Sequence, residues 1–106
     1  MTTVTIQLDK DGFLVHLTDW NEVAAAELAA AENIELTEAH WELIHLVRRF
    51  YSQFEVSPAM RPLAKQIRIQ LGEDKANSIY LMQLFPGSPA KLLAKIAGLP
   101  RPTNCL

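Results

Sequence analysis

The sequence predicts a mostly α-helical domain with a small N-terminal β-hairpin, an α+β arrangement that ends in an extended C-terminal arm. Three observations carry this prediction. Apolar residues recur at three- and four-residue steps through most of the chain after residue 18, as one face of a helix requires. Two β-prone segments flank an Asp-Gly pair near the N-terminus. Two prolines at alternate positions follow the last helical pattern and block both helix and central strand.

The hairpin is predicted over residues 4–17. Residues 4–8 alternate apolar and polar side chains, residues 13–17 are rich in β-prone residues, and Asp11-Gly12 lies in the turn between them. A two-stranded hairpin is only marginally stable alone. We therefore expect it to pack against the helical body.

Two helices are predicted in the first half of the chain. The first covers residues 23–31, with Thr18 or Asp19 as its cap, and the second starts after a cap at Thr37. The apolar stripe of the second helix is the clearest in the chain and makes it the expected centre of the core. It consists of Leu43, Ile44, Val47, Phe50, Tyr51 and Phe54.

Three shorter helices follow. Ser57 is the expected cap of the third helix, Pro58 its first residue and Gly72 its end, while Pro62 should delay the regular start. The fourth begins near Asp74 and stops before the break at residues 86–87. The Ser-Pro pair at residues 88–89 starts the fifth helix, which stops at residue 98.

Residues 1–98 are thus the expected helical body and residues 99–106 an arm of the same domain. The arm should be extended and partly polyproline-like, so its seven steps from Gly98 to Cys105 span roughly 20 Å. That exceeds the radius of gyration of about 13 Å expected for a domain of this size. Unless it is docked, the arm can therefore reach beyond its own body. Its residues before the thiol include Gly98, Leu99, Pro100, Arg101 and Pro102.

Cys105, next to the last residue, is the only cysteine in the 106 residues. One cysteine excludes an internal disulfide and a zinc site made of cysteines alone. A thiol near a chain end is usually exposed, so it can enter a partner's active site and accept a sulfur atom as a persulfide. Arg101 is the only nearby cation and the terminal carboxylate disfavours the thiolate, so activation is expected from the partner.

No cofactor or metal is predicted. His40 and His45 are five residues apart, roughly 140° around a helix, and do not share a face with each other. His16 lies far from both in sequence, and no carboxylate spacing completes a site. None of the four glycines stands in a phosphate-binding pattern.

Charge is unevenly distributed along the chain. Residues 1–56 contain ten acidic and three basic side chains, whereas residues 57–106 contain two acidic and seven basic ones. A basic half can favour an anionic partner or a thiolate, although solvated charge on helix surfaces is the commoner explanation. The start of the chain lacks signal-peptide features, and no apolar stretch is long enough to span a membrane. With a free thiol, this favours a cytoplasmic location.

Two groups of residues are candidate binding surfaces, and each also has a simpler structural role. Trp41 could form a recognition patch with Arg48 and Arg49, although a tryptophan at a helix start more often packs in the core. The third and fourth helices, joined at residues 72–74, could form a DNA-binding helix-turn-helix. Packing of two helices without a nucleic-acid role is commoner.

The final run, from Lys95 to Leu106, resembles the C-terminal signature of the DsrC/TusE family: a helix end, a Gly-Leu-Pro-Arg-Pro arm and a penultimate cysteine. Similar stretches occur at residues 36–42, 47–51, 57–61, 77–81 and 84–91, so the resemblance covers essentially the whole chain. Ala94 stands where two-cysteine members of the family carry their second thiol. The chain is therefore similar to the single-cysteine TusE branch.

The resemblance implies a sulfur-relay protein with Cys105 as its persulfide carrier, a sulfurtransferase if such a carrier is counted as an enzyme. The implied donor is similar to the TusBCD complex and the implied acceptor is similar to MnmA, a tRNA 2-thiouridylase. Contact with tRNA would be indirect, through the acceptor. The alternative is a DsrC-like (sulfite reductase gamma-subunit-like) interaction or regulatory protein that binds a sulfur-metabolism enzyme or DNA.

Overall fold

The computed structural model of the chain describes residues 6–102. Within them lie five α-helices: α1 (Glu22–Ala31), α2 (Glu38–Phe54), α3 (Met60–Leu71), α4 (Ser78–Leu84) and α5 (Pro89–Ile96). Two short 3-10 helices complete the order, η1 (Leu17–Asp19) before α1 and η2 (Glu73–Lys75) between α3 and α4. None of these helices is long and apolar enough to cross a membrane.

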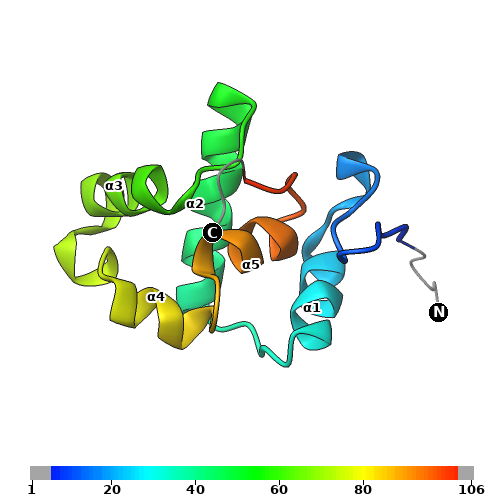
Figure 1. Cartoon of the computed structure of the whole chain (residues 1–106), viewed down its shortest axis with the longest axis horizontal. Helices are drawn as coiled ribbons and strands as arrows, with labels where there is room; N and C mark the ends of the chain where they lie inside the picture. The colour runs from blue at the N-terminus through cyan, green and yellow to red at the C-terminus, as the bar shows by residue number, and fades with distance from the viewer. Residues whose placement is uncertain (1–5, 103–106) are drawn as a thin grey trace.

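The fifth helix, rather than the long second helix, occupies the centre of the fold. Helix α5 packs against each of α1, α2, α3 and α4, and Figure 1 shows it in the middle of the molecule. Most of its residues are buried, Leu93 and Ile96 almost completely. Helix α2 buries Leu43 and Ile44, but its last turn leaves the core and Phe54 is 52% exposed. The centre of the core was therefore predicted in the wrong helix.

The predicted N-terminal hairpin is wrong. In residues 6–102 the only β pairing is one isolated antiparallel bridge between Leu8 and Leu14, and no strand forms. Phe13 and Leu14 are both buried, although neighbouring residues of a strand point to opposite faces. The chain therefore curls so that both side chains enter the core. Residues 4 and 5 of the predicted hairpin lie outside the described residues.

A tight turn remains where the hairpin was expected. The Gly12 N–H donates to the Asp9 carbonyl at 3.0 Å, and the Asp9 carboxylate accepts from the backbone N–H of Phe13 at 3.0 Å and of Asp11 at 2.8 Å. These hydrogen bonds, chiefly the one from Phe13, lower the pKa of Asp9 below its ordinary value. The predicted Asp-Gly turn is thus present, but it belongs to a loop.

Helix starts differ from prediction where another side chain is the better cap. Asn21 caps α1 by accepting from the Ala24 N–H at 2.7 Å, whereas Thr18 and Asp19 belong to η1. Asn77 caps α4 in the same way, three residues after the predicted start, because η2 intervenes.

Two predictions about the second helix and the end of the third are confirmed. Thr37 caps α2 together with His40, whose Nδ1 accepts from the Thr37 N–H at 3.1 Å. The other ring nitrogen lies 2.9 Å from the Leu84 carbonyl. Because a carbonyl only accepts, Nε2 carries the proton and His40 joins α2 to the end of α4. Helix α3 ends at Gly72 as predicted.

Candidate functional site

The C-terminal arm begins where α5 ends in a glycine cap. The Gly98 N–H donates to the Lys95 carbonyl at 3.1 Å, and the Leu99 N–H donates to the Ala94 carbonyl at 2.9 Å. Gly98 has φ +74°, the left-handed conformation that this pair of bonds requires. Leu99 is 3% exposed and packs in the core. The helix end and the first residue of the arm are therefore parts of the body.

Two side chains hold the carbonyls that α5 leaves unpaired at its end. The Trp20 indole N–H donates to the Ile96 carbonyl at 2.9 Å, and the Arg48 guanidinium donates to the Ala97 carbonyl at 2.7 Å. The Arg48 guanidinium carbon also lies 3.8 Å from the centroid of the Trp20 ring. Partial burial lowers the pKa of Arg48, but a guanidinium stays charged and suits the negative end of a helix.

The next residues of the arm are held from two sides. On one side, the Ser57 hydroxyl donates to the Pro100 carbonyl, and Ser57 itself is buried. On the other, Arg101 forms an ion pair with Asp11, and its guanidinium carbon lies 5.1 Å from the centroid of the Phe13 ring. The turn at residues 9–12 therefore contributes directly to the base of the arm.

Ser57 was predicted as the cap of the third helix, and this prediction is wrong. Helix α3 starts at Met60 with Ala59 at its cap position, which places Pro62 third in the helix, where the missing N–H costs nothing. The helix therefore starts later than predicted, with Pro58 before it and Pro62 inside its first turn. The Ser57 hydroxyl is thereby free to bond the arm.

Replacing Ser57 with alanine tests this anchor. We expect the free energy of unfolding to fall by about 1 kcal/mol, the usual contribution of one such hydrogen bond. The amide of Leu99 should also exchange its hydrogen faster, because the arm loses a contact at the next residue, Pro100. Ser52→Ala, at an exposed position on α2, is the matched control. If both variants unfold and exchange alike, Ser57 does not anchor the arm.

The structure divides the predicted arm. Residues 98–102 pack on the body, with Pro102 also buried, so this part of the arm is docked. Cys105 lies outside the described residues. It follows Pro102 by three residues, which span at most about 11 Å. The reach of the thiol is therefore measured from Pro102 and is about half of the predicted 20 Å.

Of the predicted recognition patch, only Arg48 lies at this site. Arg48 stacks on Trp20, while Trp41 packs partly buried against the core and stacks on His45, so the patch with Arg49 does not form. Within residues 6–102 no three histidine, cysteine or acidic side chains gather as metal ligands.

The proposed helix-turn-helix is interrupted by η2. Two of its bases are paired, Lys75 with Glu42 at 2.7 Å and Arg68 with Glu73 at 2.9 Å. The hydrogen bond to Glu42 raises the pKa of Lys75. These pairs reduce the positive charge available for DNA.

Comparisons with known proteins agree with the resemblance. A family model described as "DsrC like protein" matches residues 1–106. A protein of Haemophilus influenzae named "Sulfurtransferase TusE homolog" is 52% identical over 103 residues, which are 97% of this chain and 94% of that protein. "Sulfurtransferase TusE" of Sodalis glossinidius is 54% identical over 101 residues, 95% of this chain and 94% of the relative.

Two solved structures share the fold. DsrC of Allochromatium vinosum, solved by NMR, is 42% identical with a TM-score of 0.86, covering 95% of this chain and 90% of that one. The oxidized gamma-subunit of the dissimilatory sulfite reductase (DsrC) from Archaeoglobus fulgidus is 40% identical with a TM-score of 0.82, covering 95% and 92%. The chain belongs to the DsrC-like family. Curated relatives in that family are sulfurtransferases, which confirms the sulfur-relay function predicted from the resemblance.

Proposed function

We propose that this protein carries sulfur as a persulfide on Cys105 and delivers it for 2-thiolation of the wobble uridine in tRNA. The single observation that carries the proposal is the position of the only thiol, three residues beyond an anchored arm base, in a chain half identical to curated sulfurtransferases. A carrier needs one nucleophilic sulfur and access to two partner sites. Residues 99–106 supply both in this proposal.

The transfer step balances without an added oxidant. The Cys105 thiolate attacks the outer sulfur of a persulfide on the donor, forming a new S–S bond. The donor's own S–S bond breaks, and its electron pair leaves as the donor thiolate. Sulfur is then passed to the acceptor in a second step of the same kind, which regenerates the Cys105 thiolate.

The proposed partners follow from the family. The donor is a complex similar to TusBCD and the acceptor a tRNA 2-thiouridylase similar to MnmA, so tRNA is met only through the acceptor. The compartment is the cytoplasm, where a lone thiol stays reduced. With one cysteine, the chain cannot form an internal disulfide, which disfavours the two-thiol chemistry of other family members.

Deleting the gene tests the destination of the sulfur. We expect hydrolysed tRNA from the deletion strain to lose its 2-thiouridine, and the wild-type gene to restore it. Liquid chromatography with mass spectrometry measures the modified nucleoside directly, with an unrelated tRNA modification as the internal control. A wild-type level of 2-thiouridine in tRNA from the deletion strain contradicts the proposed destination of the sulfur. Sulfur uptake by Cys105 is measured separately, on the purified protein.

A further inference from the structure

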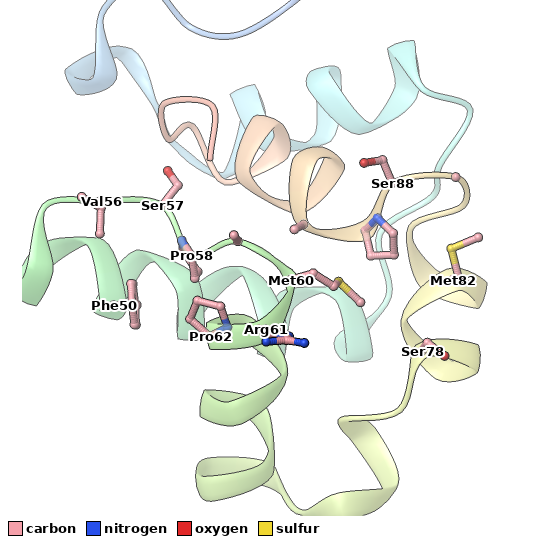
Figure 2. Close-up of a pocket in the computed structure, with 14 residues that line it drawn as sticks. Phe50, Val56, Ser57, Pro58, Met60, Arg61, Pro62, Ser78, Met82 and Ser88 are labelled. Atoms are coloured by element: carbon pink, nitrogen blue, oxygen red, sulfur yellow. The ribbon is translucent and has the colours of Figure 1, made fainter. Parts of the chain in front are cut away.

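An apolar groove runs along the side of the molecule next to the arm. It lies between the end of α2, the start of α3, α4 and the start of α5, and its volume is about 650 Å³. Figure 2 shows Phe50 and Val56 toward one end and Met82 and Ser78 toward the other, with Met60 between them. A second hollow, which Leu8 and Lys95 help to line, is smaller at about 200 Å³.

Large apolar side chains in the groove are exposed to solvent. Val56 is 53% exposed and Met82 43% exposed, and Phe50 and Met60 are half-buried. Methionine side chains are flexible and polarizable, so a pair of them on α3 and α4 can adapt to an inserted side chain. A contiguous exposed apolar surface of this kind is typical of a protein-binding site.

The rim of the groove is positive. Arg61 is the only charged residue among the fourteen described residues that line it. Lys65 lies one turn further along α3 on the same face, and both side chains are exposed. Neither forms an ion pair within residues 6–102. The complementary ligand surface is therefore apolar and flanked by carboxylates.

The groove is joined to the arm through one residue. Ser57 lines the groove and also donates its hydroxyl to the Pro100 carbonyl. A protein seated in the groove therefore lies next to the base from which the last residues of the chain continue. Cys105 follows Pro102 by at most about 11 Å of chain, which favours delivery of the thiol to a protein seated beside Ser57.

We propose that this groove docks the protein that donates sulfur, which inserts an apolar side chain between Met60 and Met82 and pairs an acidic side chain with Arg61. This inference rests on the proposed function. The acceptor is disfavoured because an enzyme that binds tRNA presents a basic surface to that polyanion. Arg61 and Lys65 repel a basic surface, and the proposal therefore requires that the donor present an acidic one.

Charge reversal in the groove tests the proposal. We expect Met82→Glu and Arg61→Glu each to raise the dissociation constant for the purified persulfide-donating complex by about tenfold or more, because each places a carboxylate against the acidic partner. Ile79→Glu is the matched control, since Ile79 lies on the same helix as Met82, is 71% exposed and does not line the groove. It adds the same charge and should change the constant less than twofold.

Four further measurements make the result decisive. Both groove variants should bind the acceptor as wild type does and take sulfur from a small-molecule persulfide at the wild-type rate. Unchanged donor binding, or a loss confined to the acceptor, overturns the inference. A wild-type dimer in sedimentation that Met82→Glu dissociates also overturns the inference, because a second copy then occupies the groove. Tighter donor binding after removal of residues 103–106 overturns it too, because the end of the chain itself then occupies the groove.

The two proposals fail in different ways. If the wild-type protein binds no donor and takes up no sulfur, the proposed function is wrong. If the wild type does both and the groove variants do so equally well, only the docking site is wrong. Circular dichroism melts of all variants establish that they remain folded.

Discussion

Replacing Cys105 with serine is expected to abolish sulfur acceptance and leave the fold intact. The chain contains no other thiol, and a serine hydroxyl is neither ionised at neutral pH nor able to form the S–S bond of a persulfide. After incubation with a persulfide donor, intact-mass spectrometry of the wild type should show a gain of about 32 Da, the mass of one sulfur atom, that reductant removes. The variant should show no gain.

The neighbouring residue provides the control for this experiment. Asn104→Ala changes the same stretch of chain and keeps the thiol, so it should gain sulfur as the wild type does. Thermal unfolding of both variants should match the wild type, because the core formed by residues 6–102 contains no cysteine. A sulfur gain in Cys105→Ser contradicts the role of Cys105 as carrier.

Among the glycines of the chain, Gly98 is the one at which we expect substitution by alanine to destabilise the fold most. A Cβ at this position would lie 2.3 Å from Cδ1 of Trp20, far inside van der Waals contact, and φ +74° adds backbone strain. Trp20 cannot easily yield, because its N–H bonds the Ile96 carbonyl and Arg48 stacks on its ring. We expect a loss of about 3 kcal/mol, which lowers the melting temperature by on the order of 10–20 °C.

Gly72→Ala separates the two causes. Gly72 also has a positive φ, +106°, but nothing lies within 4 Å of a Cβ built there. It therefore reports backbone strain without a collision, in a different conformation with ψ 165°. The collision itself is measured in a Trp20→Ala background, where Gly98→Ala should cost markedly less than in the wild type. An equal cost of Gly98→Ala in the two backgrounds contradicts a tight contact between Trp20 and the base of the arm.

Local pattern was a good guide to the helices and a poor one to the N-terminus. The stripe of α2 and the Ser-Pro start of α5 were recognised because apolar spacing and proline position are properties of neighbouring residues. Apolar and polar side chains partly alternate in residues 6–17, as in a strand. Both Phe13 and Leu14 are nevertheless buried against the helices, and this burial stabilises the chain more than pairing of two strands would. Tertiary packing overrides β-propensity in this way when no third strand is present.

The anchoring residues could not be found from the sequence. Arg48 was singled out with the wrong aromatic partner, Ser57 was assigned to a helix cap, and Trp20 and Asp11 were given no role at the arm. The partners are 43 to 90 positions apart: Ser57 with Pro100, Arg48 with Ala97, Trp20 with Ile96, and Asp11 with Arg101. One signal was present in the sequence: Gly98 at the end of the fifth helix indicates a left-handed backbone there. It does not identify Trp20 as the side chain that packs against it.

The sequence by itself determined the succession of five helices, the family and the single thiol near the end of the chain, because each depends on residue identity and short-range spacing. Only the tertiary structure decided that α5 is the central helix, that residues 98–102 are anchored to the body, and that an apolar groove with a basic rim adjoins them. These features arise where α1, α2 and the segments around residues 11 and 57 meet the end of α5. Such convergence depends on how helices pack, and no local periodicity encodes it.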